Sequence, residues 1–129
     1  MPDRLLLVDD EEPILFSMGE YFSSQGYAVD RARSCEEAQN LWSRRPDLAI
    51  VDLRLSGTRR EDGLDVAQYV RDRDPEMPII LMTGFASQHA REEARRIGIG
   101  AFLSKPVPLS ELGWVVRELL RQRQVVPVS

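Results

Sequence analysis

Short runs of apolar residues alternate along the chain with longer segments in which apolar and polar residues recur at helical spacing. The apolar runs are residues 5–8, 27–29, 48–51, 78–82 and 101–103, and their length predicts five strands. The amphipathic segments cover approximately residues 12–25, 34–45, 62–73, 87–97 and 110–122, which predicts five helices. The pattern is therefore a strand followed by a helix, five times in succession.

Three of the apolar runs, residues 5–8, 48–51 and 78–82, show no alternation of apolar and polar side chains. This is typical of strands that are covered on both faces, and connections of helix length join parallel neighbours. The sequence thus predicts an α/β fold, a doubly wound five-stranded parallel sheet with five helices. We expect one domain over residues 1–122 and a tail or linker stub over 123–129.

Composition and charge narrow the class of protein. The 129 residues are 43% hydrophobic and 29% charged, a balance typical of one globular domain. A single cysteine excludes an intramolecular disulfide, and no apolar leader follows Met1, so we expect a reducing cytoplasm. The net charge of -4 argues against direct nucleic-acid binding. No apolar run approaches the roughly 20 residues of a membrane-spanning helix, so we expect no membrane contact.

Polar residues stand at the carboxyl ends of four predicted strands, where open parallel sheets bind ligands. They are Asp9, Asp10, Asp52, Thr83 and Lys105. Carboxylates that lie together repel one another unless a cation or a raised pKa compensates. Because this ligand set contains only oxygen, with neither thiolate nor imidazole, it favours Mg2+.

A carboxylate beside Mg2+ and a lysine is equipped to attack phosphorus. It is already ionised and needs no general base, while the metal and the ammonium neutralise the oxygens of the transferred group. A position on the central strand favours Asp52 over Asp9 and Asp10 as the nucleophile. The predicted product is an aspartyl phosphate.

The same segments resemble the receiver domain of bacterial two-component response regulators. The resemblance rests on Leu-Leu-Leu-Val-Asp-Asp at 5–10, Leu-Ala-Ile-Val-Asp at 48–52, Ile-Ile-Leu-Met-Thr-Gly at 79–84 and Phe-Leu-Ser-Lys-Pro at 102–106. It extends over residues 4 to about 122 and implies a flavodoxin-like strand order of 2-1-3-4-5. It also implies that a sensor histidine kinase or a histidine phosphotransfer protein supplies the phosphoryl group.

The resemblance assigns roles to the strand-end residues. Asp9 and Asp10 match the acidic pair at the metal, Asp52 the phosphoacceptor and Lys105 the lysine that pairs with the phosphoryl group. The resemblance further implies that the peptide bond between Lys105 and Pro106 is cis.

Two further residues match the switch of the family. The hydroxyl of Thr83 is expected to move to the phosphoryl group, and the ring of Phe102 to turn inward behind it. This would change the face made by the fourth helix, the fifth strand and the fifth helix. That face would act on a downstream protein or a covalently linked output domain. The sequence does not decide whether phosphorylation also produces a homodimer.

The segment after the acceptor departs from the family pattern. Ser56 replaces a proline and about three additional residues precede Gly63, so we expect a longer and more mobile loop from Ser56 to Asp62. Arg54 is expected to offer its backbone carbonyl to the metal. Its side chain and that of Phe85 are expected to set the lifetime of the acyl phosphate.

Three aromatic residues on helical segments have simpler interpretations. Phe16 projects about 200° away from Ile14 around the first helix, which makes it a candidate docking contact for the kinase or phosphotransfer partner or a surface residue without a role. Trp42 and Trp114 occur at helical spacing and are interpreted as core or half-buried anchors.

Two other classes of function, a binding module and an enzyme, fit these residues less well than the switch. A phosphorylation-independent binding module of the same fold would lack the acceptor, an acid or the lysine, and all are present. A flavodoxin-like FMN protein needs a phosphate-cradling loop where residues 9–12 are all acidic. An aspartate-nucleophile phosphatase typically has a second Asp where this chain has Arg54. We therefore expect a signalling domain, not an enzyme, with intrinsic autophosphorylation and autodephosphorylation chemistry.

Overall fold

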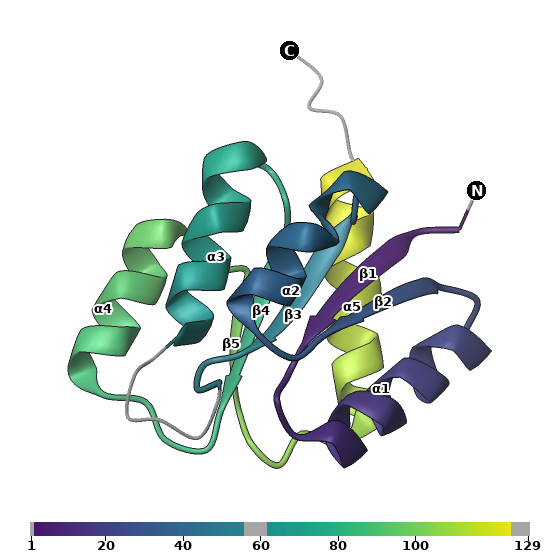
Figure 1. The fold of residues 1–129 in the computed structure, drawn as a ribbon, viewed down its shortest axis with the longest axis horizontal. Helices are drawn as coiled ribbons and strands as arrows, with labels where there is room; N and C mark the ends of the chain where they lie inside the picture. Colours follow the sequence, from purple (N-terminus) through teal and green to yellow (C-terminus); the bar gives the residue numbers. More distant parts are fainter. Residues whose placement is uncertain (1, 56–61, 125–129) are drawn as a thin grey trace.

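The computed structural model describes residues 2–55 and 62–124 and arranges them in three layers (Figure 1). The middle layer is a sheet of five strands, β1 (Arg4–Val8), β2 (Ala28–Ala32), β3 (Leu48–Asp52), β4 (Ile79–Thr83) and β5 (Ala101–Ser104). Every neighbouring pair is parallel and the order is β2-β1-β3-β4-β5. The predicted doubly wound sheet and its flavodoxin-like strand order are confirmed.

Helices cover both faces of this sheet (Figure 1). One face carries α1 (Glu12–Ser24) and α5 (Leu109–Gln124), and the other carries α2 (Cys35–Asn40), α3 (Asp62–Arg73) and α4 (Gln88–Ile97). Successive residues of a strand point to opposite faces, so each strand contributes to two separate cores. In β1, Leu5 and Leu7 pack beneath α1 and α5, while Leu6 and Val8 pack beneath the other three helices.

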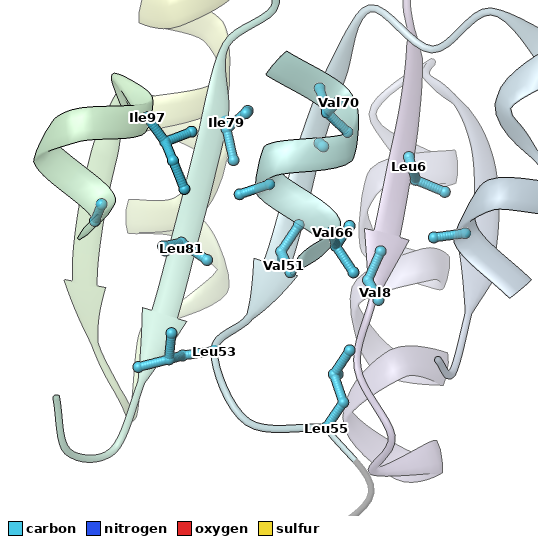
Figure 2. Close-up of a cluster of buried hydrophobic side chains, with 14 of the residues drawn as sticks. Leu6, Val8, Val51, Leu53, Leu55, Val66, Val70, Ile79, Leu81 and Ile97 are labelled. Carbon is cyan, nitrogen blue, oxygen red and sulfur yellow. The ribbon is translucent and has the colours of Figure 1, made fainter. Parts of the chain in front are cut away.

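Figure 2 shows the core beneath α2, α3 and α4. Val66 and Val70 of α3 and Ile97 of α4 are buried against the sheet in this cluster. Leu53 and Leu55, which follow β3, are also fully buried in it. The backbone that leaves the end of β3 is therefore held by two leucine side chains.

Two elements differ from the prediction. The strand expected over 27–29 runs on to Ala32, because the polar residue Asp30 is buried at this sheet edge by ion pairs with Arg4 and Arg44. The helix expected over 34–45 ends at Asn40 and is followed by a 3-10 turn over Trp42–Arg44. Arg45, which precedes a proline, adopts a left-handed φ of 57° and ends that turn.

The remaining boundaries lie within a residue or two of those predicted, and hydroxyl caps account for two of them. The side chain of Ser34 accepts a hydrogen bond from the Glu37 N–H at the start of α2, and that of Ser87 accepts one from the Ala90 N–H at the start of α4. Residues 56–61 of the predicted loop from Ser56 to Asp62 lie outside the described residues, and Asp62 already begins α3. Of the tail predicted over 123–129, Arg123 and Gln124 belong to α5 and residues 125–129 lie outside the described residues, so the division of the chain at residue 122 stays a prediction. In the described part of the chain, no helix combines the length and the apolar composition needed to cross a membrane.

Candidate functional site

The polar residues at the strand ends meet at one edge of the sheet. Asp52 and Thr83 are the last residues of β3 and β4, while Asp9 and Lys105 directly follow β1 and β5. These strands are parallel neighbours, so their carboxyl ends lie side by side. A cleft of about 600 Å³ opens there, lined by Asp10, Glu11, Asp52, Arg54, Thr83, Gly84, Phe85 and Lys105.

Three carboxylates gather at this edge of the sheet, two of them lining the cleft and the third, Asp9, buried beside it. Asp9, Asp10 and Asp52 each offer an oxygen, and these oxygens lie within 4.8 Å of one another. Asp9 is fully buried and Asp52 is 6% exposed. The pKa of the Asp9 carboxyl is raised, chiefly by burial and further by the negative charge of Asp52. The hydrogen bond from the Glu11 N–H and the nearby Lys105 act in the opposite direction but do not outweigh burial. The site thus concentrates negative charge that a divalent cation would balance.

Lys105 supplies the one ammonium that contacts these carboxylates among the described residues. Its Nζ lies 3.0 Å from Asp52 Oδ2 and 3.4 Å from Asp9 Oδ2. Burial acts to lower the pKa of Lys105, but the hydrogen bond and the charge of Asp52, together with Asp9, outweigh it and raise the pKa. One positive charge against three carboxylates leaves two formal negative charges, and the oxygen-only donors suit Mg2+. The residues present therefore fit the ion.

The backbone around Lys105 fixes where its side chain starts. The Lys105 N–H donates to the carbonyl of Thr83 over 2.8 Å, which continues the pairing of β5 with β4. The peptide bond between Lys105 and Pro106 is cis, as the resemblance implies. Lys105, just after β5, is thus held next to Thr83 at the end of the neighbouring strand β4.

Thr83 and Phe102 lie on the side of the site that leads to α4. Thr83 is 3% exposed, and its hydroxyl donates to the Phe85 carbonyl over 2.6 Å and accepts from the Phe85 N–H over 3.1 Å. Phe102 is half-buried against the core beneath α4, and the guanidinium of Arg91 lies 5.4 Å from its ring centre. A cavity of about 200 Å³ borders the ring and is lined also by Ala94, Arg95 and Ile99.

Arg54 and Phe85 both line the cleft. The Arg54 N–H lies 3.3 Å from Asp52 Oδ1 and orients that carboxylate, while the Arg54 side chain is exposed. Phe85 is 72% exposed. The influence expected from these two residues on the lifetime of the acyl phosphate, and the role expected for the Arg54 carbonyl at the metal, stay predictions.

Gly63 is a site residue that the sequence reasoning missed. It lies in the first turn of α3, and its N–H donates to the Leu53 carbonyl over 2.8 Å. A side chain at this position would clash with the Asp52 carbonyl oxygen and with the Leu53 Cα. The signal available in the sequence was a glycine placed where the segment after Asp52 enters a helix.

The surface beside the site has one predicted and one unpredicted feature. Phe16 is 60% exposed on α1, as its helical position predicts. On the other side of α1, an apolar groove of about 520 Å³ runs between α1 and the start of α5, and it includes Ile14, Lys105 and Val107. The groove was missed because it forms between segments about 90 residues apart in the sequence.

The interpretation of the two tryptophans was correct for one of them. Trp42 is half-buried and its ring meets that of Tyr69 edge-on at 5.9 Å. Trp114 is 58% exposed, so the anchor role expected for it was wrong. Leu112, Val116 and Leu120 of α5 face the sheet, and a residue two positions from Leu112 lies on the far side of the helix.

Known proteins match this chain over almost its whole length. The family model described as response regulator receiver domain matches residues 5–117. The photosynthetic apparatus regulatory protein RegA of Cereibacter sphaeroides is 35% identical over 95% of this chain and 64% of its own length. The response regulator MprA of Mycolicibacterium vanbaalenii is 35% identical over 95% of this chain and 52% of its own length. The chain thus spans about half to two thirds of these two relatives.

Solved structures share the fold from end to end. A response regulator receiver domain protein from Methanospirillum hungatei has a TM-score of 0.88 at 27% identity, over 96% of this chain and 98% of its own. The signal receiver domain of an HD domain-containing protein from Pseudomonas fluorescens has a TM-score of 0.85 at 29% identity, over 95% and 98%. This chain therefore shares the fold of these receiver domains over almost the whole length compared.

Proposed function

This chain belongs to the response regulator receiver domain family, and from that premise we propose that it is a switch in which Asp52 accepts a phosphoryl group from the phosphohistidine of a partner protein. Receiver domains of this family are signalling domains of two-component systems. The observation that carries the proposal is the Asp52 carboxylate, 3.0 Å from the Lys105 ammonium and within reach of two further carboxylates.

The transfer uses groups that are already in place. A carboxylate oxygen of Asp52 attacks phosphorus in line with the phosphorus–nitrogen bond of the donor, and the electron pair of that bond leaves with the imidazole nitrogen. Asp9, Asp10 and Asp52 would hold Mg2+, which supplies positive charge to the phosphoryl oxygens when bound. Asp52 is held for the attack by the Arg54 N–H on one oxygen and by Lys105 on the other.

Lys105 changes partner during this reaction. In the described state its ammonium pairs with Asp52 and Asp9. Once Asp52 carries the phosphoryl group, the ammonium pairs with a phosphoryl oxygen. The raised pKa of Lys105 keeps the side chain charged for that role at neutral pH.

Thr83 carries the change away from the site. Its hydroxyl holds the Phe85 carbonyl at rest, and turning to a phosphoryl oxygen breaks that bond. The segment that leads into α4 is then released, and the Phe102 ring turns inward. The altered face of α4, β5 and α5 acts on a downstream protein or on a linked output domain.

Three residues around the rim tune this reaction. Phe16 is exposed on α1 beside the acidic edge and contributes to docking of the histidine kinase or phosphotransfer protein. Arg54 and Phe85 border the path of the attacking water and set the lifetime of the acyl phosphate. Substituting either by alanine is therefore expected to change the rate of phosphoryl loss, while leaving the mass gained on phosphorylation the same.

The proposal is tested by intact mass after incubation with acetyl phosphate and Mg2+. We expect the chain to gain one phosphoryl group, and the gain to be lost in Asp52→Asn and after chelation of the metal. Asp65→Asn is the matched control, because Asp65 is an exposed carboxylate on α3 outside the cleft. A gain that persists in Asp52→Asn would place the acceptor elsewhere. No gain in wild type, from acetyl phosphate or from a phosphorylated kinase, would favour the phosphorylation-independent binding module.

A further inference from the structure

An arginine of α3 closes the end of α4 that lies farthest from the site. Arg71 donates from Nε to the Ile97 carbonyl over 3.0 Å and from Nη2 to the Gly98 carbonyl over 2.9 Å. These are among the last carbonyls of the helix, which have no partner within it. Gly98 has a left-handed φ of 85° and ends α4. The carboxyl end of α4 is therefore held by a side chain of its neighbour.

Arg71 is also connected to α5 through hydrogen bonds that pass by way of Asp74. Arg71 Nη1 donates to the Asp74 carbonyl over 2.9 Å, and the Asp74 carboxylate accepts from Arg123 of α5 over 2.7 Å. Arg123 also donates to the Asp47 carbonyl, 3.0 Å away, just before β3. Arg71, Asp74 and Arg123, here called the arginine relay, thus join α4 to the last turn of α5. Figure 1 shows that α3, α4 and α5 all end at the sheet edge opposite the strand ends that form the site.

The ion pair in the relay is less exposed than the neighbouring surface pair of Arg121 with Glu118. Its side chains are 30% exposed for Arg123 and 24% exposed for Asp74. Burial acts to raise the pKa of Asp74, but hydrogen bonds from Arg123 and the Glu76 N–H, with the charges of Arg123 and Arg71, lower it overall. By contrast, Arg121 in the same turn pairs with Glu118 of its own helix and is 65% exposed. Among the contacts of the described residues, Arg123 joins α5 to the loops at Asp74 and Asp47, whereas the ion pair of Arg121 stays within α5.

Helix α4 is suited to transmit a displacement along its length. It starts at Gln88, five residues after Thr83, and spans ten residues to Ile97, which is about 15 Å of rigid helix. Its buried side chains are two alanines and Ile97, so apolar packing holds it weakly. A shift of its amino end would be carried to its carboxyl end, where Arg71 contacts it.

We propose that the arginine relay couples the position of α4 to the order of the last turn of α5, which makes that turn an output element of the domain. The inference rests on the proposed function, because phosphorylation of Asp52 is what moves α4. When α4 shifts, Arg71 loses the Ile97 and Gly98 carbonyls and no longer holds the Asp74 turn. Arg123 then loses its partner and the last turn of α5 loosens.

The test is amide hydrogen exchange of residues 119–123 in the full chain, with and without beryllofluoride and Mg2+. In wild type we expect exchange roughly two- to fivefold faster with the phosphate mimic, the change that loss of one partly exposed ion pair produces. Arg71→Lys keeps the positive charge but removes the guanidinium group that donates to several carbonyls at once. In this variant, exchange of residues 119–123 is expected to be fast already without the mimic and to stay the same with it. Arg121→Gln is the matched control on α5, and it should respond like wild type.

The outcomes separate this inference from the proposed function. If the mimic changes exchange over residues 84–97 but not over 119–123 in wild type, the relay is overturned and the phosphorylation switch stands. If the mimic changes exchange in neither segment, the proposed phosphorylation switch is contradicted. The relay is then tested by comparing variants without the mimic. In the resting state, Arg71→Lys should speed exchange of residues 119–123. Arg96→Gln, which removes a different hydrogen bond between α4 and α3, the one to Gln68, should not. Equal exchange of residues 119–123 in these two variants would refute the relay.

Discussion

Helices α1 and α4 cover opposite faces of one sheet and are anchored to it very differently. The side chains that α1 buries include Leu15, Met18 and Phe22, whereas those of α4 are Ala90, Ala94 and Ile97. Stabilisation by burial scales with apolar area, so α1 is bound far more firmly. The acidic pair that precedes α1 therefore sits on a rigid support, while the segment from Thr83 leads into a helix that can move.

The weaker helix is held in place by polar contacts instead. Arg71 binds the carbonyls at the end of α4, and Arg96 donates to Gln68 of α3 over 3.0 Å. Hydrogen bonds of this kind can be exchanged for water at modest net cost, unlike the burial of a large apolar side chain. A switch needs both properties at one sheet edge, a frame that keeps its geometry and an element with two positions.

The largest expected effect on stability comes from removing a large buried side chain of α1, the firmly anchored helix. Phe22 is fully buried, with Tyr21 and Tyr27 edge-on to its ring. Phe22→Ala should lower the free energy of unfolding by about 3–5 kcal/mol, measured by urea denaturation. The transition should remain a single one, because both cores share the sheet. A loss under about 1 kcal/mol would contradict the contrast between the two halves.

A smaller effect is expected at the contact between α3 and the acceptor strand. Gly63→Ala places a methyl group against the Asp52 carbonyl oxygen, and we expect a loss of about 1–3 kcal/mol in the free energy of unfolding. Because the backbone of Asp52 must shift, phosphorylation by acetyl phosphate should also slow. Gly100→Ala is the control, since its added carbon would lie at an ordinary 3.4 Å from the Ile79 carbonyl. Equal phosphorylation rates in the two variants would rule out a positioning role for Gly63.

Shortening a buried side chain of α4 should lower the free energy of unfolding by less, and the effect should be confined to that helix. Ile97→Val removes one buried methylene group and should lower the free energy of unfolding by about 0.5–1.5 kcal/mol. Hydrogen exchange over residues 88–97 should accelerate more than exchange over residues 12–24, since α4 can open without the rest of the domain. Uniform acceleration of both helices would show instead that α4 opens only with the whole fold.

The smallest effect is a pH dependence at Asp74. The pKa of Asp74 lies below its ordinary value of 3.8 in the folded state. Its contribution to stability is therefore present above the unfolded pKa and is lost as the pH falls through the folded pKa. At pH 7, Asp74→Asn should be less stable than wild type by roughly 0.5–1 kcal/mol. Urea denaturation at a series of pH values should show this difference shrinking at the acidic end, and a constant difference would contradict the assignment.

Periodicity and strand-end chemistry made most of the fold and the centre of the candidate site predictable. Uninterrupted apolar runs identify strands buried on both faces, and parallel pairing then brings Asp9, Asp52 and Lys105 to one edge. The edge strand β2 was predicted too short, because Asp30 is buried only through arginines elsewhere in the sequence.

Other features depend on contacts that no local pattern contains. The approach of Gly63 to Asp52 and the link from Arg71 to Arg123 join residues on different elements. The exposure of Trp114, by contrast, could have been predicted from the sequence. The helical spacing of Leu112, Val116 and Leu120 already identifies the buried face of α5, and Trp114 is not on it. In that case the signal was present in the sequence and was misread.

The most direct test follows hydrogen exchange helix by helix in one sample whose intact mass shows a phosphoryl group on Asp52. The account predicts faster or slower exchange over residues 88–97 of α4 after phosphorylation, with residues 12–24 of α1 unchanged. Phosphorylated protein in which α4 is unchanged, or in which α1 responds as strongly as α4, would contradict the division into a rigid support and a movable helix.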